Sequence, residues 1–240
     1  MEKEIRIKTG DGHVIYGTLT KAKGKSKRLI IFVHGLAGHK NEHIFFNAAR
    51  FFPKRGYSTF RFDLYSWQKG ARKLRNCTIT LHGKDVKRIV NFFKGKGYQQ
   101  IFLVGHSLGG PITLLSDTSK LNAIVLWDPT YNLKRLFSSE VYKKIDYGVV
   151  FDWGIDIVIG KKMYREAMKF DSRKLIKNIK VPIKIGVAGK GILVEGARKY
   201  FHDANPPKDL TIIKGATHGF DEEGAEEILF KETLKWLDKF

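Results

Sequence analysis

The chain has 240 residues, enough to bury one sizeable core and an ordinary length for a single α/β domain. Its 44 Lys and Arg residues against 24 Asp and Glu residues give a formal net charge of +20. The single cysteine, Cys77, excludes an internal disulfide, and no cluster of Cys, His and acidic residues has the spacing of metal ligands. We therefore expect one domain over residues 1–240, with no metal site.

The excess positive charge is spread over the whole chain, is mostly lysine, and accompanies no recognisable nucleic-acid-binding motif. We interpret it first as a solvated surface. Because net charge attracts anions at long range, we expect at most weak, salt-sensitive contact with anionic surfaces and no specific nucleic-acid partner. Residues 1–4 are charged and unlike a secretory signal, and no apolar run reaches the length of a membrane span, so we expect a cytoplasmic protein.

Strand-like apolar runs alternate along the chain with helical patterns, which predicts a largely parallel sheet covered by helices on both faces. A hairpin around the turn at residues 9–12 opens the chain, and one long interval, residues 131–179, breaks the alternation. The expected strands are 5–7, 14–16, 28–33, 57–64, 101–104, 122–127, 180–189 and 210–213, and the expected helices are 81–94, 111–115, 194–200 and 225–240.

Residues 105–110 (GHSLGG) are the most informative motif, because they follow one apolar strand and precede a helix without a spacer. Glycines on both sides of Ser107 let the strand and helix approach closely while the serine takes a strained backbone conformation. This nucleophile elbow exposes the serine hydroxyl. The sequence therefore predicts Ser107 as a catalytic nucleophile rather than part of a structural turn.

A serine needs a base, and His218 lies in the glycine-flanked loop after the strand at residues 210–213. The order is serine first and histidine last, as in other elbow-type hydrolases, so we predict His218 as the general base. The loop at residues 34–39 (HGLAGH) follows another buried strand. We expect the backbone amides of Leu36 and Leu108 to form the oxyanion hole, with His34 bracing that loop.

Together these motifs resemble the α/β-hydrolase superfamily, in particular the small feruloyl or cinnamoyl esterases and related lysophospholipase-like hydrolases. The resemblance covers nearly the whole chain; residues 57–64 resemble the fourth strand of these enzymes and residues 180–189 the seventh. It implies the α/β-hydrolase fold, with a mostly parallel sheet of about eight strands. It also implies that residues 131–179 form a cap between the sixth and seventh strands, above the edge of the sheet where ligands bind.

The cap interval is rich in aromatic residues. Some of these rings should line an acyl or aryl pocket, and others should pack the cap onto the body. The rings concerned are Tyr131, Phe137, Tyr142, Tyr147, Phe151, Trp153, Tyr164 and Phe170.

Two segments depart from the family pattern. After Asp63 the family has a glycine-rich turn, whereas residues 65–70 (YSWQKG) are bulkier and basic. After Gly189 the family places its catalytic aspartate within a few residues, whereas residues 190–193 (KGIL) hold no carboxylate. The acid that would orient His218 must therefore come from elsewhere or be missing.

Asp128 is the predicted substitute, because it follows the sixth strand as an Asp-Pro pair, in the way lipases similar to the pancreatic type carry their acid. The sixth and seventh strands should be neighbours, so a carboxylate from either end could reach His218. Glu195 is the main rival, although we expect it on a helix and facing away. The remaining alternatives are that Asp128 is only a turn residue and that His218 works in a dyad.

The sequence thus predicts a serine esterase that cleaves small acyl or aryl esters through an acyl-enzyme at Ser107 and needs no cofactor. A thioesterase, lactonase, peptidase or acyltransferase could use the same residues, because a fold and a triad do not set the substrate. The alternative from a different class is a hydrolase-like binding protein with weak or no turnover.

Overall fold

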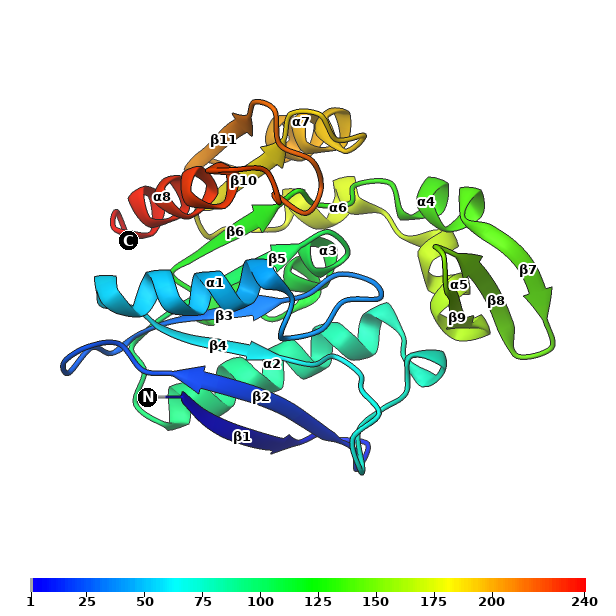
Figure 1. Cartoon of the computed structure of the whole chain (residues 1–240), viewed down its shortest axis with the longest axis horizontal. Coiled ribbons are helices and arrows are strands. Elements are labelled where there is room, and N and C mark those ends of the chain that lie inside the picture. The colour runs from blue at the N-terminus through cyan, green and yellow to red at the C-terminus, as the bar shows by residue number, and fades with distance from the viewer. Residues whose placement is uncertain (1) are drawn as a thin grey trace.

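Residues 2–240 are described by a computed structural model, in which one sheet of eight strands forms the body (Figure 1). The first pair and the contact between β2 and β4 are antiparallel, and the other neighbours are parallel. This confirms the mostly parallel α/β-hydrolase sheet and its opening hairpin. In spatial order the strands are β1 (Glu2–Lys8), β2 (Val14–Thr20), β4 (Ser58–Phe62), β3 (Arg28–Val33), β5 (Gln100–His106), β6 (Ala123–Trp127), β10 (Ile183–Ala188) and β11 (Lys208–Ile213).

Helices cover both faces of the sheet, because the central strands bury their side chains on both sides. Along β3, Leu29 and Ile31 belong to one apolar core, and Ile30 and Phe32 belong to the other. The first core is covered by α2 (Ile79–Gly95), α3 (Gly109–Leu115) and α7 (Val194–Asp203), and the second by α1 (His43–Phe51) and α8 (Ala225–Leu237). Three short 3₁₀ helices, Phe52–Arg55, Leu74–Asn76 and Thr118–Lys120, complete the body.

The interval between β6 and β10 is an insertion that extends from one edge of the body (Figure 1). It contains a separate three-stranded antiparallel sheet, which the sequence reasoning did not predict. Phe137 and Phe151 are fully buried and pack edge to face, so these two rings belong to the apolar core of the insertion. Its elements are α4 (Leu133–Ser139), β7 (Val141–Ile145), β8 (Gly148–Asp152), β9 (Asp156–Gly160), α5 (Lys161–Lys169) and α6 (Ser172–Lys177).

The order of the strands decides where the candidate residues meet. Since β5, β6 and β10 are adjacent and parallel, their carboxyl ends open onto the same edge. Ser107 follows β5, and Asp128 follows β6. Within residues 2–240, no helix combines the length and the apolar character that crossing a bilayer requires.

Candidate active site

Ser107 stands at a sharp turn between β5 and α3, with a left-handed φ of 55°. Only glycine fits on either side of it: a Cβ on Gly105 would lie 2.4 Å from the carbonyl oxygen of Gly109, and a Cβ on Gly109 would lie 2.1 Å from that of Val33. A non-glycine residue at positive φ is strained and is held there by its surroundings. The turn therefore has the geometry of the predicted elbow.

His218 lies in the loop after β11 and contacts Asp128. Its Nδ1 is 2.6 Å from Oδ2 of Asp128, so the ring donates a proton to the carboxylate and leaves Nε2 available. Asp128 is fully buried with a φ of 41°, and its Oδ1 accepts a hydrogen bond of 3.1 Å from the amide of Ala188. The contact expected between Asp128 and His218 is present, and its role in catalysis stays a prediction.

The segment after β10, where the family pattern places its acid, lies beside the Asp128 carboxylate without clashing with it. A Cβ on Gly191 would lie 3.5 Å from Oδ2 of Asp128, an ordinary contact distance. Glu195 instead lies in the first turn of α7, exposes 73% of its side chain and pairs with Lys199 at 3.3 Å. The structure thus brings Asp128, and not Glu195, to His218.

The loop that carries Leu36 lies directly against the serine. A Cβ on Gly35 would lie 2.9 Å from Cβ and 3.3 Å from Oγ of Ser107, so the backbone approaches the hydroxyl closely. Within residues 2–240, neither the Leu36 amide nor the Leu108 amide donates to a main-chain acceptor. Both donors predicted for the oxyanion hole are therefore free of main-chain partners.

His34 is locked inside this loop. Its Nδ1 donates to the carbonyl of Gly35 at 2.8 Å, and its Nε2 accepts from the amide of Leu64 at 2.9 Å. Burial lowers its pKa to about 4, which keeps the ring neutral, and the two hydrogen bonds fix the tautomer. These bonds fit the bracing role predicted for His34 and leave neither nitrogen for proton transfer.

His106 is a second buried histidine at the site, and the sequence reasoning overlooked it. Its Nε2 donates to the carbonyl oxygen of His218 at 3.0 Å, and the two rings stack with centroids 4.6 Å apart. Burial, together with the neighbouring His218, lowers its pKa to about 3, so the ring is neutral. Its place directly before Ser107 was the only signal in the sequence, and the partner lies 112 residues away.

Glu42 was also overlooked. This half-buried carboxyl precedes α1, and its oxygens lie 2.9 and 3.0 Å from the position of a Cβ on Gly38 in the Leu36 loop. Burial raises its pKa to about 7, although His43 and His218 both oppose the shift. Its Oε2 has no hydrogen-bond partner within residues 2–240. A carboxyl that titrates near neutral pH therefore lies close to the site.

His43 ties the loop of His218 to α1. Its Nε2 is 2.7 Å from Oδ1 of Asp221, and its Nδ1 is 2.6 Å from Oε1 of Glu226. Asp221 follows His218 by three residues, so this bridge holds the end of the histidine loop.

A cavity of about 390 Å³ opens over these groups, and three of its lining residues come from the cap. Leu136, Glu140 and Trp153 form the cap side, where the indole nitrogen of Trp153 donates to Oε2 of Glu140 at 2.6 Å. Among the aromatic residues of the cap, Trp153 lines this cavity. The complete lining is Leu36, Ser107, Asp128, Thr130, Leu136, Glu140, Trp153, Ile192, Leu193 and His218.

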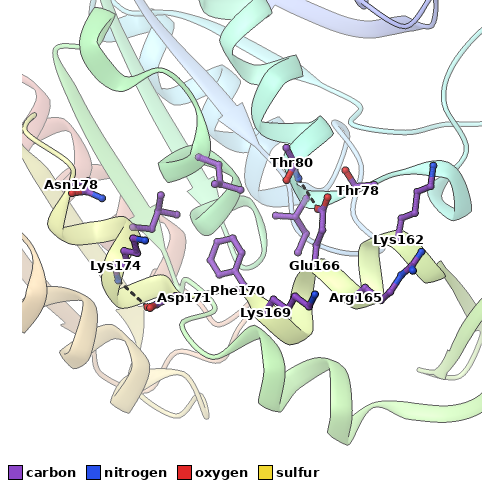
Figure 2. Close-up of a pocket in the computed structure, with 13 residues that line it drawn as sticks. Thr78, Thr80, Lys162, Arg165, Glu166, Lys169, Phe170, Asp171, Lys174 and Asn178 are labelled. Atoms are coloured by element: carbon purple, nitrogen blue, oxygen red, sulfur yellow. Dashed lines mark hydrogen bonds between the residues drawn. The ribbon is translucent and has the colours of Figure 1, made fainter.

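A larger cavity, of about 680 Å³, lies between the cap helices α5 and α6 and the start of α2 (Figure 2). Its lining includes neither Ser107 nor His218. Oε2 of Glu166 accepts from the amide of Thr80 at 2.9 Å, a bond drawn in Figure 2 that ties the cap to α2. We interpret this space as the junction of cap and body.

Comparison with solved structures shows the same fold in several hydrolases. The chain is similar to Est1E from Butyrivibrio proteoclasticus, solved with ferulic acid bound, at 19% identity and a TM-score of 0.84, over 98% of this chain and 99% of that one. It is similar to the esterase domain of a Rhodothermus marinus protein at 17% identity and a TM-score of 0.78, over 98% and 97%. It is similar to a monoacylglycerol lipase from Paleococcus ferrophilus at 20% identity and a TM-score of 0.73, over 93% and 98%.

No curated protein matches the sequence significantly. The model of the alpha/beta hydrolase family matches residues 30–182, which is more than half of the chain and includes the Leu36 loop, the Ser107 elbow and Asp128. The chain therefore belongs to the alpha/beta hydrolase family.

Proposed function

We propose that the protein is a serine hydrolase that cleaves carboxylic esters with small acyl or aryl groups through an acyl-enzyme at Ser107. The observation that carries this proposal is the 2.6 Å contact between His218 and Asp128 beside a serine held at positive φ. A nucleophile, a base and a buried carboxylate that orients the base are the parts that acyl transfer requires.

In the proposed first step, Oγ of Ser107 attacks the acyl carbon while its proton passes to Nε2 of His218. The Asp128 carboxylate stabilises the resulting imidazolium through Nδ1. The negative oxygen is held by the amides of Leu36 and Leu108, a contribution of about 3 kcal/mol for each donor. His218 then gives the proton to the leaving alcohol as the ester bond breaks, which leaves the acyl group on Ser107.

Water completes the cycle by the reverse proton transfers. It loses a proton to His218 as it attacks the acyl carbon, and Ser107 recovers a proton when its bond to the acyl group breaks. The products are the free acid and the regenerated enzyme. Every proton in this sequence is carried by His218, so the reaction needs no cofactor.

The cavity over Ser107 supports small substrates. A volume of about 390 Å³ lies at the lower end of the range for small-molecule sites, and the cap forms one side of it. We expect short or flat acyl groups to be preferred, and emulsified triolein to be hydrolysed poorly. The ferulic acid named for Est1E is a flat acid of this kind.

The proposed function is tested first by covalent labelling of Ser107 and then by measuring ester hydrolysis. A fluorophosphonate probe should label wild-type protein rapidly and Ser107→Ala not at all, because labelling requires an activated hydroxyl. Hydrolysis of p-nitrophenyl esters of increasing acyl length, beside methyl ferulate, then identifies the preferred acyl group. Absence of both labelling and turnover in folded protein would favour the alternative, a hydrolase-like protein that only binds its ligand.

A further inference from the structure

A further cavity, of about 490 Å³, lies beside the one over Ser107, and we call it the second cavity. It is distinct from the larger space between the cap helices and α2. Its walls are mostly apolar or aromatic, which is typical of small-molecule sites. It includes none of the three candidate catalytic side chains, and neither the family match nor the related structures assign it a role. Its lining is Ala37, Tyr65, Ser66, Trp67, Lys73, Leu74, Arg75, Tyr147, Ile155, Asp156, Ile157 and Val158.

One wall is the segment in which this chain departs from the glycine-rich turn of its family. Trp67 exposes 90% of its surface, as much as any large apolar residue in the described chain. Its ring has one charged neighbour, Nζ of Lys73 at 4.5 Å. Tyr147 and Ile155, which line the same cavity, expose 57% and 68% of their surfaces. A group of exposed apolar side chains around one cavity is typical of a binding site.

Two short segments of the chain line both the cavity over Ser107 and the second cavity. Leu36 lines the cavity over Ser107, and the next residue, Ala37, lines the second cavity. Likewise Trp153 lines the first and Ile155 lines the second, although both belong to the short turn between β8 and β9. The Leu36 loop and the tip of this hairpin therefore lie between the two cavities.

The back wall of the second cavity is rigid. The Tyr65 ring packs edge to face on His34, with centroids 5.3 Å apart, and lies 6.0 Å from the ring of His82. Both histidines are buried, and His34 bonds to the carbonyl of Gly35 within the Leu36 loop. A packed tyrosine ring and an exposed indole in the lining of one cavity are suited to binding a planar ring.

We propose that the second cavity binds a planar apolar ring at the far end of the acyl part of the substrate. The acyl part is assigned because His218 must reach the leaving alcohol, and His218 lines only the cavity over Ser107. Among the flat acyl groups expected above, the favoured ones are then those in which a ring is joined to the carbonyl through a linker long enough to pass Leu36 and the tip of the hairpin. This inference rests on the proposed function for its assignment to an acyl group, but not for the binding of a ring.

The first test needs no catalysis. Calorimetric titration of Ser107→Ala with 2-naphthol should show saturable binding that Trp67→Ala weakens about tenfold, the loss of roughly 1.4 kcal/mol expected for an aromatic contact. Ile192→Ala is the matched control, because Ile192 is equally exposed, at 90%, but lines the other cavity. Loss of binding in Ile192→Ala with normal binding in Trp67→Ala, or no binding in any variant, would overturn the proposal.

The second test uses p-nitrophenyl esters of unbranched acids with and without a terminal phenyl group, at increasing linker length. In wild type the phenyl group should raise kcat/KM about tenfold beyond a threshold length, and this gain should vanish in Trp67→Ala while short esters react normally. If the gain appears instead with phenylalkyl acetates, the assignment to the acyl part is wrong. Turnover without any gain would overturn the inference alone, whereas binding of naphthol without any turnover would overturn only the proposed function.

Discussion

The two sides of Ser107 are built differently. On the body side, Asp128, His106 and His34 are buried, and each is fixed by hydrogen bonds to the main chain. On the opposite side, the side chains that line the two cavities include exposed apolar groups, such as Trp67 in the turn after β4 and Ile155 in the cap. The proposed chemistry thus rests on the ends of sheet strands, and the proposed recognition rests on turns, which can vary without disturbing the sheet.

The largest effect should come from the body side. Ser107→Ala should lower kcat by about 10⁶-fold, because it removes the nucleophile on which the base and the acid act. The fold should survive, since alanine is smaller and fits the same turn. Steady-state kinetics and a thermal melt would check both points. Near wild-type turnover by a folded Ser107→Ala protein would contradict the whole mechanism.

The next effect separates the two candidate acids. Asp128→Asn should lower kcat by about 10⁴-fold, because an amide stabilises the wrong tautomer of His218 and cannot stabilise its cation. Glu195→Gln is the control and should be nearly neutral, since Glu195 pairs with Lys199 in solvent. Both variants should be measured on one ester. Activity that survives in Asp128→Asn but not in Glu195→Gln would mean that the acid lies on α7, and survival in both would mean a dyad.

A smaller effect should come from His106, which acts through His218 and is a positioning residue. His106→Phe keeps a ring against His218 but removes the donor to its carbonyl oxygen. Without that bond the His218 loop is held less firmly, so we expect kcat to fall roughly tenfold with KM unchanged, since a misplaced base costs turnover rather than binding. His202→Phe, on an exposed histidine of α7, is the control. An equal fall in kcat for both variants, or a change confined to KM, would argue against positioning.

Glu42 is the exception on the body side, because its Oε2 lacks a partner. Its pKa is about 7 when folded and near its ordinary value of 4.5 when unfolded, so the folded protein holds the proton more tightly. The free energy of unfolding should therefore fall as the pH rises from 4.5 to 7, by at most about 3 kcal/mol, and then level off. Glu42→Gln should remove this loss.

Urea unfolding at pH 4.5 and pH 8 provides the measurement. Glu42→Gln should be clearly more stable than wild type at pH 8 and nearly equal to it at pH 4.5. Glu227→Gln gives a reference for removing a carboxylate elsewhere, because the Glu227 side chain in α8 is 62% exposed and pairs with the exposed Lys231. A gain of the same size at both pH values would show that the Glu42 carboxyl is not the titrating group.

The sequence was sufficient to place a candidate residue where the placement depends only on neighbouring residues in the chain. The elbow at Ser107 and the Asp128-Pro129 pair each follow a continuous apolar strand, so the strand ends could be placed before the structure was known. The strands β7–β9 were missed because the pattern in β7 does not alternate: Lys143 and Lys144 are consecutive and both exposed, so β7 has no apolar face to mark it as a strand.

The contacts of His106 and Glu42 could not be predicted from the sequence, for a different reason. His106 bonds a carbonyl 112 residues away, and the pKa of Glu42 depends on how deeply the Leu36 loop buries it. Neither quantity has a counterpart in the local pattern of residues. The second cavity is similar, since Trp67 was visible as a departure but its neighbours Tyr147 and Ile155 come from the cap.

The position of Asp128 has a consequence for how this protein could change over generations. In relatives with the acid after the seventh strand, mutations in that loop put catalysis at risk. Here residues 190–193 carry no proposed catalytic group, yet Ile192 and Leu193 border the cavity over Ser107. A library that randomises Ile192 and Leu193 should therefore yield mostly active enzymes with shifted preferences, which makes this loop the natural starting point for laboratory evolution of the protein.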